Sequence, residues 1–310
     1  MRLGTFSSTE LEPFFGIEIK TKVLRIAKTA ETLKYRQPQQ AHLACMQSYL
    51  EGLPHSETIL RKLLADIATA PELVVENAQD GFPHLLHQSE IQYLAPVQRP
   101  GKILCVGMNY RDHCLEQNKP IPEIPMLFSK FATSLNHQLG EIPLPLKLDP
   151  CCDYEAELAV VIGKRASNVT KRNALNHVAG YTIMNDVTAR SLQKNEKQWI
   201  RGKGFDGSAP LGPVLVTPDE LDDPANLDVR CRVNGELRQQ SNTSQMIFSV
   251  PELIAYITQA ITLEPGDIIS TGTPGGVGVY REPAVFLQPG DEVSAEVAGI
   301  GKLENRCVKK

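Results

Sequence analysis

The chain has 310 residues, of which 42% are apolar, so it can bury one large core or two of moderate size. Its 32 basic and 36 acidic side chains give a formal net charge of −4 without a long basic run, which excludes the electrostatic footprint of a nucleic-acid-binding protein. No apolar stretch approaches the roughly 20 residues that cross a bilayer, so we expect no membrane association.

Cysteine usage and the first residues predict the compartment. The seven cysteines are an odd number without a C-x-x-C pair, and Cys151 and Cys152 are adjacent, which suits neither a structural disulfide nor a zinc site. The start from Met1 to Phe6 has neither the apolar core of a signal peptide nor an arginine-rich transit pattern. From these features we expect a cytoplasmic protein.

Residues 1–95 are predicted to form a small N-terminal α+β domain. Short apolar runs predict strands at residues 1–6, 14–19 and 22–27. Apolar residues recurring at the i, i+3, i+4 spacing predict helices at residues 40–50 and 57–67. The polar segment 88–100, which carries two prolines, marks the boundary with the next domain.

Residues 96–310 are predicted to form a larger domain dominated by strands. Short β-branched runs bounded by Gly, Pro, Asn and Asp predict strands at residues 102–107, 158–162, 211–216, 227–233 and 267–271. Helices are expected at residues 171–177 and 250–261, the second behind a capping box formed by Ser249 and Glu252. The predicted fold class is therefore α+β, mostly β.

An acidic pair precedes one of the predicted strands. Glu155 and Glu157 are two residues apart, so both side chains point to the same face, where their like charges favour a bound cation. Asp186 follows another strand-like run and can supply a third carboxylate to a hard dication. An isolated E-x-E pair also fits an ordinary solvated strand face, so spacing alone leaves both interpretations open.

Six motifs occur in order along the chain from about Ile91 to the C-terminus. They are Gly107-Met108-Asn109-Tyr110, His113 with Glu116, Asp153 to Gly163, Asn185-Asp186-Val187-Thr188-Ala189-Arg190, Gly202-Lys203-Gly204-Phe205-Asp206 and Thr271 to Gly278. In this order they resemble the fumarylacetoacetate hydrolase superfamily. The resemblance is greatest to its fumarylacetoacetate hydrolase domain-containing protein 2 subgroup, through the stretch from Cys105 to Cys114.

This resemblance implies a mixed β-sheet roll as the catalytic domain, a homodimer, and a metal centre. The family's ligands to Mg²⁺ or Mn²⁺ fall on Glu155, Glu157 and Asp186, the same residues that spacing selects. Some relatives have an arginine that binds a substrate carboxylate where this chain has Met108, which leaves the substrate open.

The resemblance also assigns catalytic and substrate-binding residues. His113 and Glu116 match the family's acid/base dyad on a lid segment, and residues three apart share one face of a helix. Lys203 matches the active-site lysine, which would neutralise developing negative charge. Without the family context, these residues would fit a surface pair and a solvated loop. The matching substrate-binding positions are Arg190, Gln193 and Thr273.

The implied protein is a metal-dependent enzyme acting on a small anionic 2-oxo acid through an enolate held at the metal. The subgroup points to enol–keto tautomerisation of oxaloacetate, with C–C hydrolysis of acylpyruvates or fumarylacetoacetate-like diketo acids as the main alternative. Isomerisation of 2-hydroxyhepta-2,4-diene-1,7-dioate and oxaloacetate decarboxylation also fit this scaffold, because one fold hosts several chemistries. A protein that binds a metal and a keto acid without turnover is the alternative outside the enzymes.

Overall fold

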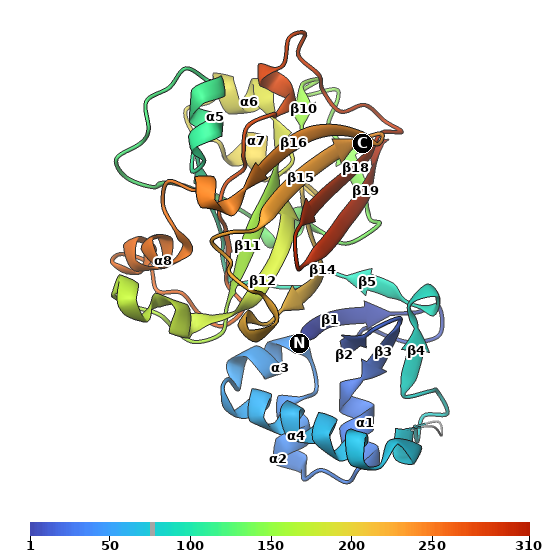
Figure 1. Cartoon of the computed structure of the whole chain (residues 1–310). Coiled ribbons are helices and arrows are strands. Elements are labelled where there is room, and N and C mark those ends of the chain that lie inside the picture. The colour runs from blue at the N-terminus through green and yellow to red at the C-terminus, as the bar shows by residue number, and fades with distance from the viewer. Residues whose placement is uncertain (75–77) are drawn as a thin grey trace.

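The structure, a computed structural model, describes residues 1–74 and 78–310 and is built around two sheets (Figure 1). A 12-stranded sheet runs in the order β4-β3-β2-β1-β14-β12-β11-β17-β6-β7, with β5 paired to β1 and β8 to β14. Its strands are β1 (Arg2–Ser7), β2 (Phe14–Ile19), β3 (Lys22–Arg25), β4 (Leu85–His87), β5 (Gln92–Leu94), β6 (Ile103–Gly107), β7 (Met126–Lys130), β8 (Leu135–Asn136), β11 (Ala156–Ile162), β12 (Val178–Asn185), β14 (Ala209–Val216) and β17 (Ile268–Ser270).

A five-stranded sheet packs against the middle of the first, in the order β16-β15-β18-β19-β9. Both sheets are mixed: β6 pairs with β17 and β9 with β19 in parallel, whereas most other neighbours are antiparallel. A short pair of strands, β10 (Cys152–Asp153) and β13 (Thr188–Ala189), lies beside them. The strands of the five-stranded sheet are β9 (Glu141–Leu144), β15 (Asp228–Val233), β16 (Glu236–Asn242), β18 (Glu292–Val297) and β19 (Gly301–Lys309).

The central strand β11 is buried along its whole length because both of its faces are covered. Leu158 and Val160 lie in the core shared with the five-stranded sheet. Ala159 and Val161, on the opposite face, belong to the core that includes the helices of the first 95 residues. This enclosure also buries the residues at the start of β11, where Glu155 and Glu157 lie.

Helices gather at two places in Figure 1. One group covers the first strands, and α5, α6 and α7 lie together at one end of the larger part of the molecule. The helices are α1 (Ile26–Thr32), α2 (Gln37–His42), α3 (Met46–Glu51), α4 (His55–Thr69), α5 (Arg111–Glu116), α6 (Arg190–Asn195), α7 (Ile200–Lys203) and α8 (Val250–Thr258).

In the first 95 residues, here called the N-terminal unit, most predicted elements are present with changed limits. The helix expected at 40–50 is divided into α2 and α3, because Cys45 adopts an extended conformation and caps a new helix with its sulfur. The strand expected at 22–27 ends at Arg25, where α1 begins. In α4 the predicted apolar face is buried through Ile59, Leu60 and Leu63.

In the larger part, the predicted strands are confirmed within a few residues as β6, β11, β14, β15 and β17. Ser249 and Glu252 form the predicted capping box of α8, which ends at Thr258 rather than at residue 261. The segment 171–177 is a 3₁₀-helix, the tighter form that short helical segments often adopt.

The predicted boundary between residues 95 and 96 remains a prediction. β1 pairs with β14 through Arg2 and Leu3, so the N-terminal unit extends the sheet that carries the acidic pair.

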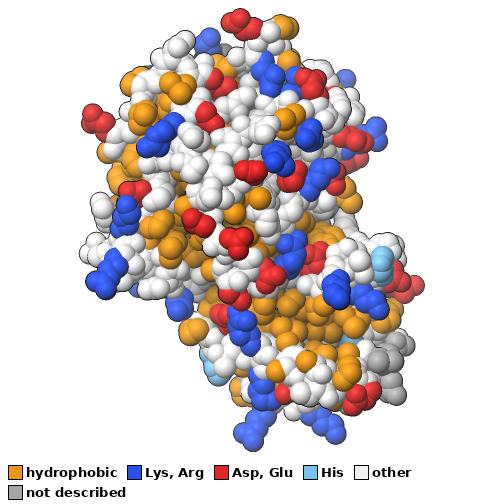
Figure 2. Space-filling view, viewed as in Figure 1, with side chains coloured by type: hydrophobic (Ala, Val, Ile, Leu, Met, Phe, Trp, Pro, Cys, Tyr) orange, Lys and Arg blue, Asp and Glu red, His pale blue; other side chains and the backbone are white. Residues whose placement is uncertain are grey.

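Figure 2 shows basic and acidic side chains interspersed over the visible face, with hydrophobic side chains gathered over β1 to β3. Among the helices of residues 1–74 and 78–310, none combines the length and apolar character that crossing a bilayer requires.

Candidate functional site

The three predicted carboxylates meet where β11 begins and β12 ends. β11 and β12 are antiparallel with Ala156 opposite Asn185, which brings the preceding Glu155 beside the following Asp186. The backbone N–H of Asp186 donates to the Glu155 carbonyl oxygen at 2.9 Å and fixes this junction. The register of the two strands therefore brings Glu155 and Asp186, which are 31 residues apart in the sequence, into one cluster.

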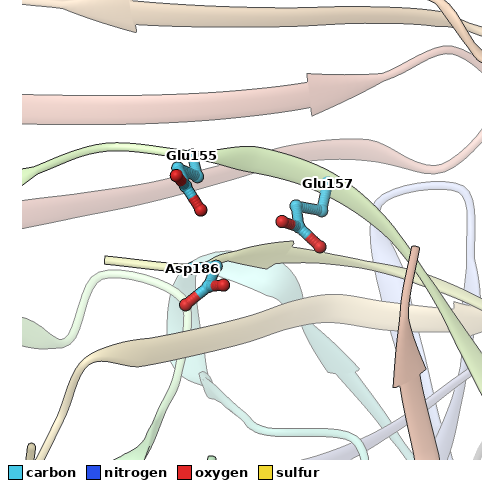
Figure 3. Close-up of side chains that lie close together, drawn as sticks. All are labelled: Glu155, Glu157 and Asp186. Carbon is cyan, nitrogen blue, oxygen red and sulfur yellow. The ribbon is translucent and has the colours of Figure 1, made fainter. Parts of the chain in front are cut away.

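The carboxylates of Glu155, Glu157 and Asp186 point toward one another (Figure 3). One oxygen from each lies within 4.8 Å of the others, and the three residues are at most 4% exposed. Two hydrogen bonds fix the Glu157 carboxylate: its Oε2 accepts from Ser270 Oγ at 2.6 Å and from the Gly272 N–H at 2.9 Å. The interpretation of the acidic pair as a solvated strand face is therefore wrong for this chain.

The two glutamates experience opposite electrostatic environments. Burial opposes ionisation of Glu155, but the positive charges of Lys203 and Arg190 outweigh burial and lower its pKa to about 2. Burial raises the pKa of Glu157 to about 8, and the charges of Asp186 and Glu155 add to the effect. The cluster thus lacks enough positive charge to keep all of its carboxylates ionised at neutral pH.

These features fit a divalent metal ion. The donor set consists of oxygen atoms alone, which hard dications prefer, and the carboxylates are already within bridging distance. Asp186 Oδ1 is buried and accepts no hydrogen bond, although the Lys130 ammonium lies 2.7 Å from it. A buried donor set made of carboxylate oxygens, including a glutamate that resists ionisation, is what a dication would satisfy.

Lys203, at the end of α7, points into the carboxylate cluster. Its Nζ contacts Glu155 Oε2, lies 2.8 Å from Asp186 Oδ2, and is 4.9 Å from the centre of the Phe128 ring. Burial disfavours the charged amine, but the carboxylates of Asp186 and Glu155 outweigh burial and raise the pKa of Lys203. The lysine is therefore an ammonium in this site.

The predicted dyad of His113 and Glu116 lies on one face of α5, as the three-residue spacing predicts. His113 Nδ1 is 2.5 Å from Glu116 Oε1. Glu116 Oε2 accepts a hydrogen bond from the Gly276 N–H at 2.7 Å, which ties α5 to the glycine-rich loop. Asp112 adds a second tie, because it accepts from the Gly275 N–H at 3.2 Å. The imidazole Nε2 is left as the ring atom that can exchange a proton with a substrate.

Arg190, at the start of α6, is held mainly by protein groups. Its Nε donates to Asp153 Oδ2 at 2.8 Å, and its Nη1 donates to Gln193 Oε1 at 3.0 Å. Its Nη2 lies 2.7 Å from Glu155 Oε1 without hydrogen-bond geometry. Of the guanidinium nitrogens, only Nη2 makes no hydrogen bond to the protein, and it remains in the ion pair with Glu155.

A cavity of about 740 Å³ brings most of the predicted residues together. Glu116 and Asp186 lie behind its wall, paired with His113 and Lys203. Thr273 lines the cavity, and its hydroxyl already donates to the Ala156 carbonyl oxygen at 3.0 Å. The predicted residues on the cavity wall are His113, Glu155, Glu157, Arg190, Gln193, Lys203 and Thr273.

Two buried charged residues of the site were not singled out from the sequence. Lys130 packs against Asp186 from β7, and Asp153 anchors Arg190 and accepts from the Gly278 and Val279 N–H groups at 2.8 and 3.0 Å. Asp153 lies within a recognised motif, so its position offered a signal. Lys130 has no such signal, because only the fold brings it to the cluster.

Comparisons with known proteins agree with this geometry. The family model described as "Fumarylacetoacetate (FAA) hydrolase C-terminal" matches residues 102–308. Oxaloacetate tautomerase FAHD2B, mitochondrial, of Bos taurus is 54% identical over 226 residues, which are 72% of this chain and 72% of that protein. Oxaloacetate tautomerase YisK of Bacillus subtilis is 47% identical over 221 residues, 70% of this chain and 73% of that protein.

The whole fold is also found among solved structures. The structure of fumarylacetoacetate hydrolase from Exiguobacterium antarcticum superposes with a TM-score of 0.80 at 33% identity, covering 100% of both chains. The mixed β-sheet fold expected from the motifs is thereby confirmed.

The expected cytoplasmic location is contradicted by these relatives. The bovine, frog and human relatives carry the word mitochondrial in their names. The seven cysteines are free in the structure. Cysteine usage does not specify a compartment, so it could not support the expected cytoplasmic location.

Proposed function

The chain belongs to the fumarylacetoacetate hydrolase family, and from this membership and the site geometry we propose that it catalyses the enol–keto tautomerisation of oxaloacetate. The observation that carries the proposal is the convergence of the carboxylate cluster, the Lys203 ammonium and the His113–Glu116 dyad on one cavity. The names of the bovine and Bacillus relatives support oxaloacetate as the substrate.

Glu155, Glu157 and Asp186 would hold Mg²⁺ or Mn²⁺, both of which favour carboxylate oxygens. When bound, the dication supplies Lewis-acid stabilisation of negative charge on the substrate oxygens. Titration of metal-depleted protein with each ion, followed by calorimetry, tests both the site and the preference. An identical heat signal from a Glu155→Ala variant would contradict this assignment.

The reaction moves protons without any redox step: the C2 hydroxyl of the enol loses a proton and C3 gains one. His113 Nε2 is the proposed proton-transfer atom, since Nδ1 is engaged by Glu116, which fixes the ring. The Lys203 ammonium stabilises the negative charge that develops on oxygen, an effect strengthened by its burial. Arg190 braces Glu155 through the ion pair of its Nη2 and would place positive charge on the cavity wall for a substrate carboxylate.

The decisive experiment follows the ultraviolet absorbance of the enol of oxaloacetate. Metal-loaded wild-type protein should accelerate its decay, and the Glu155→Ala variant should not. The exposed Glu292, on β18, supplies a matched Glu292→Gln control that should behave as wild type. No acceleration by the metal-loaded wild type would sink the proposed function.

C–C hydrolysis of acylpyruvates is a second candidate, favoured by the size of the cavity. At about 740 Å³ it exceeds what a four-carbon acid fills, so a longer acyl chain has room. A water molecule activated by His113 would then attack a carbonyl carbon. Release of pyruvate from an acylpyruvate, without acceleration of enol decay, would favour hydrolysis; binding of both acids without turnover would favour a binding protein.

We also propose a homodimer, on the precedent of the family resemblance. Sedimentation equilibrium of the full chain tests it, with a mass near twice the 34.2 kDa of one chain expected. A mass of one chain across the accessible concentrations would contradict it.

A further inference from the structure

Lys130 is a buried cation that the proposed reaction does not use directly. It ends β7, and neither its side chain nor that of Asp186 has any exposed surface. The cavity wall includes its strand neighbour Phe128, whereas Lys130 lies behind that wall. It therefore does not touch a substrate in the cavity, and any effect it has on the reaction must act through other residues.

Its contacts join two segments that carry the site. Lys130 Nζ donates to the Val187 carbonyl oxygen at 3.2 Å and to the carbonyl oxygen of Lys203. The same ammonium lies 2.7 Å from Asp186 Oδ1. One side chain from β7 thus links the end of β12 to the end of α7.

These contacts restrict two functional groups. The Asp186 carboxylate lies between two ammonium groups, with Lys130 at Oδ1 and Lys203 at Oδ2, so its rotation is opposed from both sides. The carbonyl bond to Lys130 fixes the backbone from which the Lys203 side chain extends. A buried ammonium without partners is strongly unfavourable, so Lys130 retains these partners as long as the fold is intact.

We propose that Lys130 is a positioning residue that holds Asp186 and Lys203 in the relative arrangement that metal binding requires. The inference rests on the proposed function, because it assigns a role toward the metal site proposed above. It deepens that proposal by adding a residue outside the predicted ligands and dyad. Groups that orient a metal ligand typically change metal affinity by about 10- to 100-fold when removed.

A purely electrostatic role for Lys130 predicts the opposite change in metal affinity. If Lys130 acted only as a nearby positive charge, its removal would relieve repulsion and tighten the binding of a dication. If it positions Asp186, its removal frees the carboxylate and weakens binding. The direction of the change in affinity therefore distinguishes the two roles.

The chain offers a matched control in another lysine paired with a buried aspartate. Lys102 Nζ lies 2.7 Å from Asp267 Oδ2, and the Asp267 side chain is 1% exposed. Neither residue contributes to the carboxylate cluster or to the cavity wall. Lys102→Met thus removes an ion pair to a buried aspartate without touching the proposed site, although the Lys102 side chain is 32% exposed and that of Lys130 is fully buried.

The experiment measures Mn²⁺ binding by the electron paramagnetic resonance signal of the free ion, on full-length wild type, Lys130→Met and Lys102→Met. Binding about 10- to 100-fold weaker for Lys130→Met, with Lys102→Met unchanged, is expected. Equal or tighter binding by Lys130→Met overturns the inference while leaving the metal site intact. Failure of the wild type to bind Mn²⁺ would instead overturn the proposed metal site.

Circular dichroism reports whether the variants fold. If Lys130→Met does not fold, Lys130→Gln carries the same titration, because its amide can still donate to a carbonyl oxygen. Unfolding of both Lys130 variants beside a folded Lys102→Met would assign Lys130 to general stability and reject the positioning role.

Discussion

The N-terminal unit and the carboxylate cluster bury opposite kinds of side chain. The helices of the unit bury Leu50 and Leu60, and its ion pair between Arg25 and Asp80 is 27% exposed on the aspartate side. The cluster instead buries three carboxylates and two lysines in an interior closed on both faces of the sheet. Burial stabilises the first region, whereas in the second it disfavours charge and prepares the cluster for a dication.

The largest expected effect comes from removing charge from the cluster. Glu157→Gln should lower kcat/KM for the enol of oxaloacetate by about a thousandfold, since a lost Lewis acid is worth about 4 kcal/mol. The Tm of the metal-free variant should equal or exceed that of wild type, because glutamine is neutral without taking up a proton, whereas Glu157 must be protonated to be buried as a neutral group. Enzyme kinetics and thermal unfolding measure the two effects, and a large loss in Tm would show that the cluster stabilises the fold.

A substitution in the core of the N-terminal unit should instead lower stability and leave metal binding unchanged. Leu60→Ala, at a fully buried position of α4, should lower the free energy of unfolding by about 3 kcal/mol through the cavity it leaves. Urea unfolding measures this loss, and Mn²⁺ affinity of the folded variant should be unchanged. A drop in affinity would mean that the two regions are coupled more tightly than their separate roles suggest.

The dyad should affect turnover more than stability. His113→Ala should lower kcat by about a hundredfold, in the range for loss of a general acid/base, with a change in Tm of only a few degrees. The exposed His55 at the start of α4 supplies the matched control, and His55→Ala should retain wild-type kcat. Equal losses in kcat and stability would assign His113 a structural role.

The smallest expected effect is a change with pH in the rise in Tm that a bound metal ion produces. The pKa of Glu157 is raised to about 8, so its neutral form contributes stability below its ordinary pKa of 4.5 and this contribution is lost as the pH rises toward 8. A bound dication favours the ionised form of Glu157, so the metal-bound protein does not lose this stability as the pH rises. The gain in Tm on adding Mn²⁺ should therefore grow by a few degrees between about pH 6 and pH 8.5. A gain that shrinks with rising pH would contradict the assignment of Glu157 as a ligand.

Local patterns in the sequence predicted what depends on neighbours along the chain. The period-two spacing of Glu155 and Glu157, the i, i+3 pair of His113 and Glu116, and the capping box of α8 are all present in the structure. Each depends only on the geometry of one strand or helix. The residue pattern also offered Asp186 as a third carboxylate, whereas Lys203 was assigned only by the family resemblance.

Long-range packing determined the rest. Lys130 belongs to an ordinary apolar strand, and only the path of β7 past α7 brings its ammonium to Asp186. The guanidinium of Arg190 was expected to bind a substrate, and nothing in the sequence indicated that Asp153 and Gln193 also accept hydrogen bonds from it. The division of residues 40–50 into two helices likewise depends on the extended backbone at Cys45, which apolar periodicity does not encode.

Glu116 serves two partners at once, because one oxygen contacts His113 Nδ1 and the other accepts from the Gly276 amide. Any movement of α5 away from the glycine-rich loop would break the second contact and release the carboxylate that orients the imidazole. Access and reactivity would then alternate in time: an open cavity exchanges substrate and product while its histidine is misaligned. A reactive keto acid would meet the aligned proton donor only while it is enclosed.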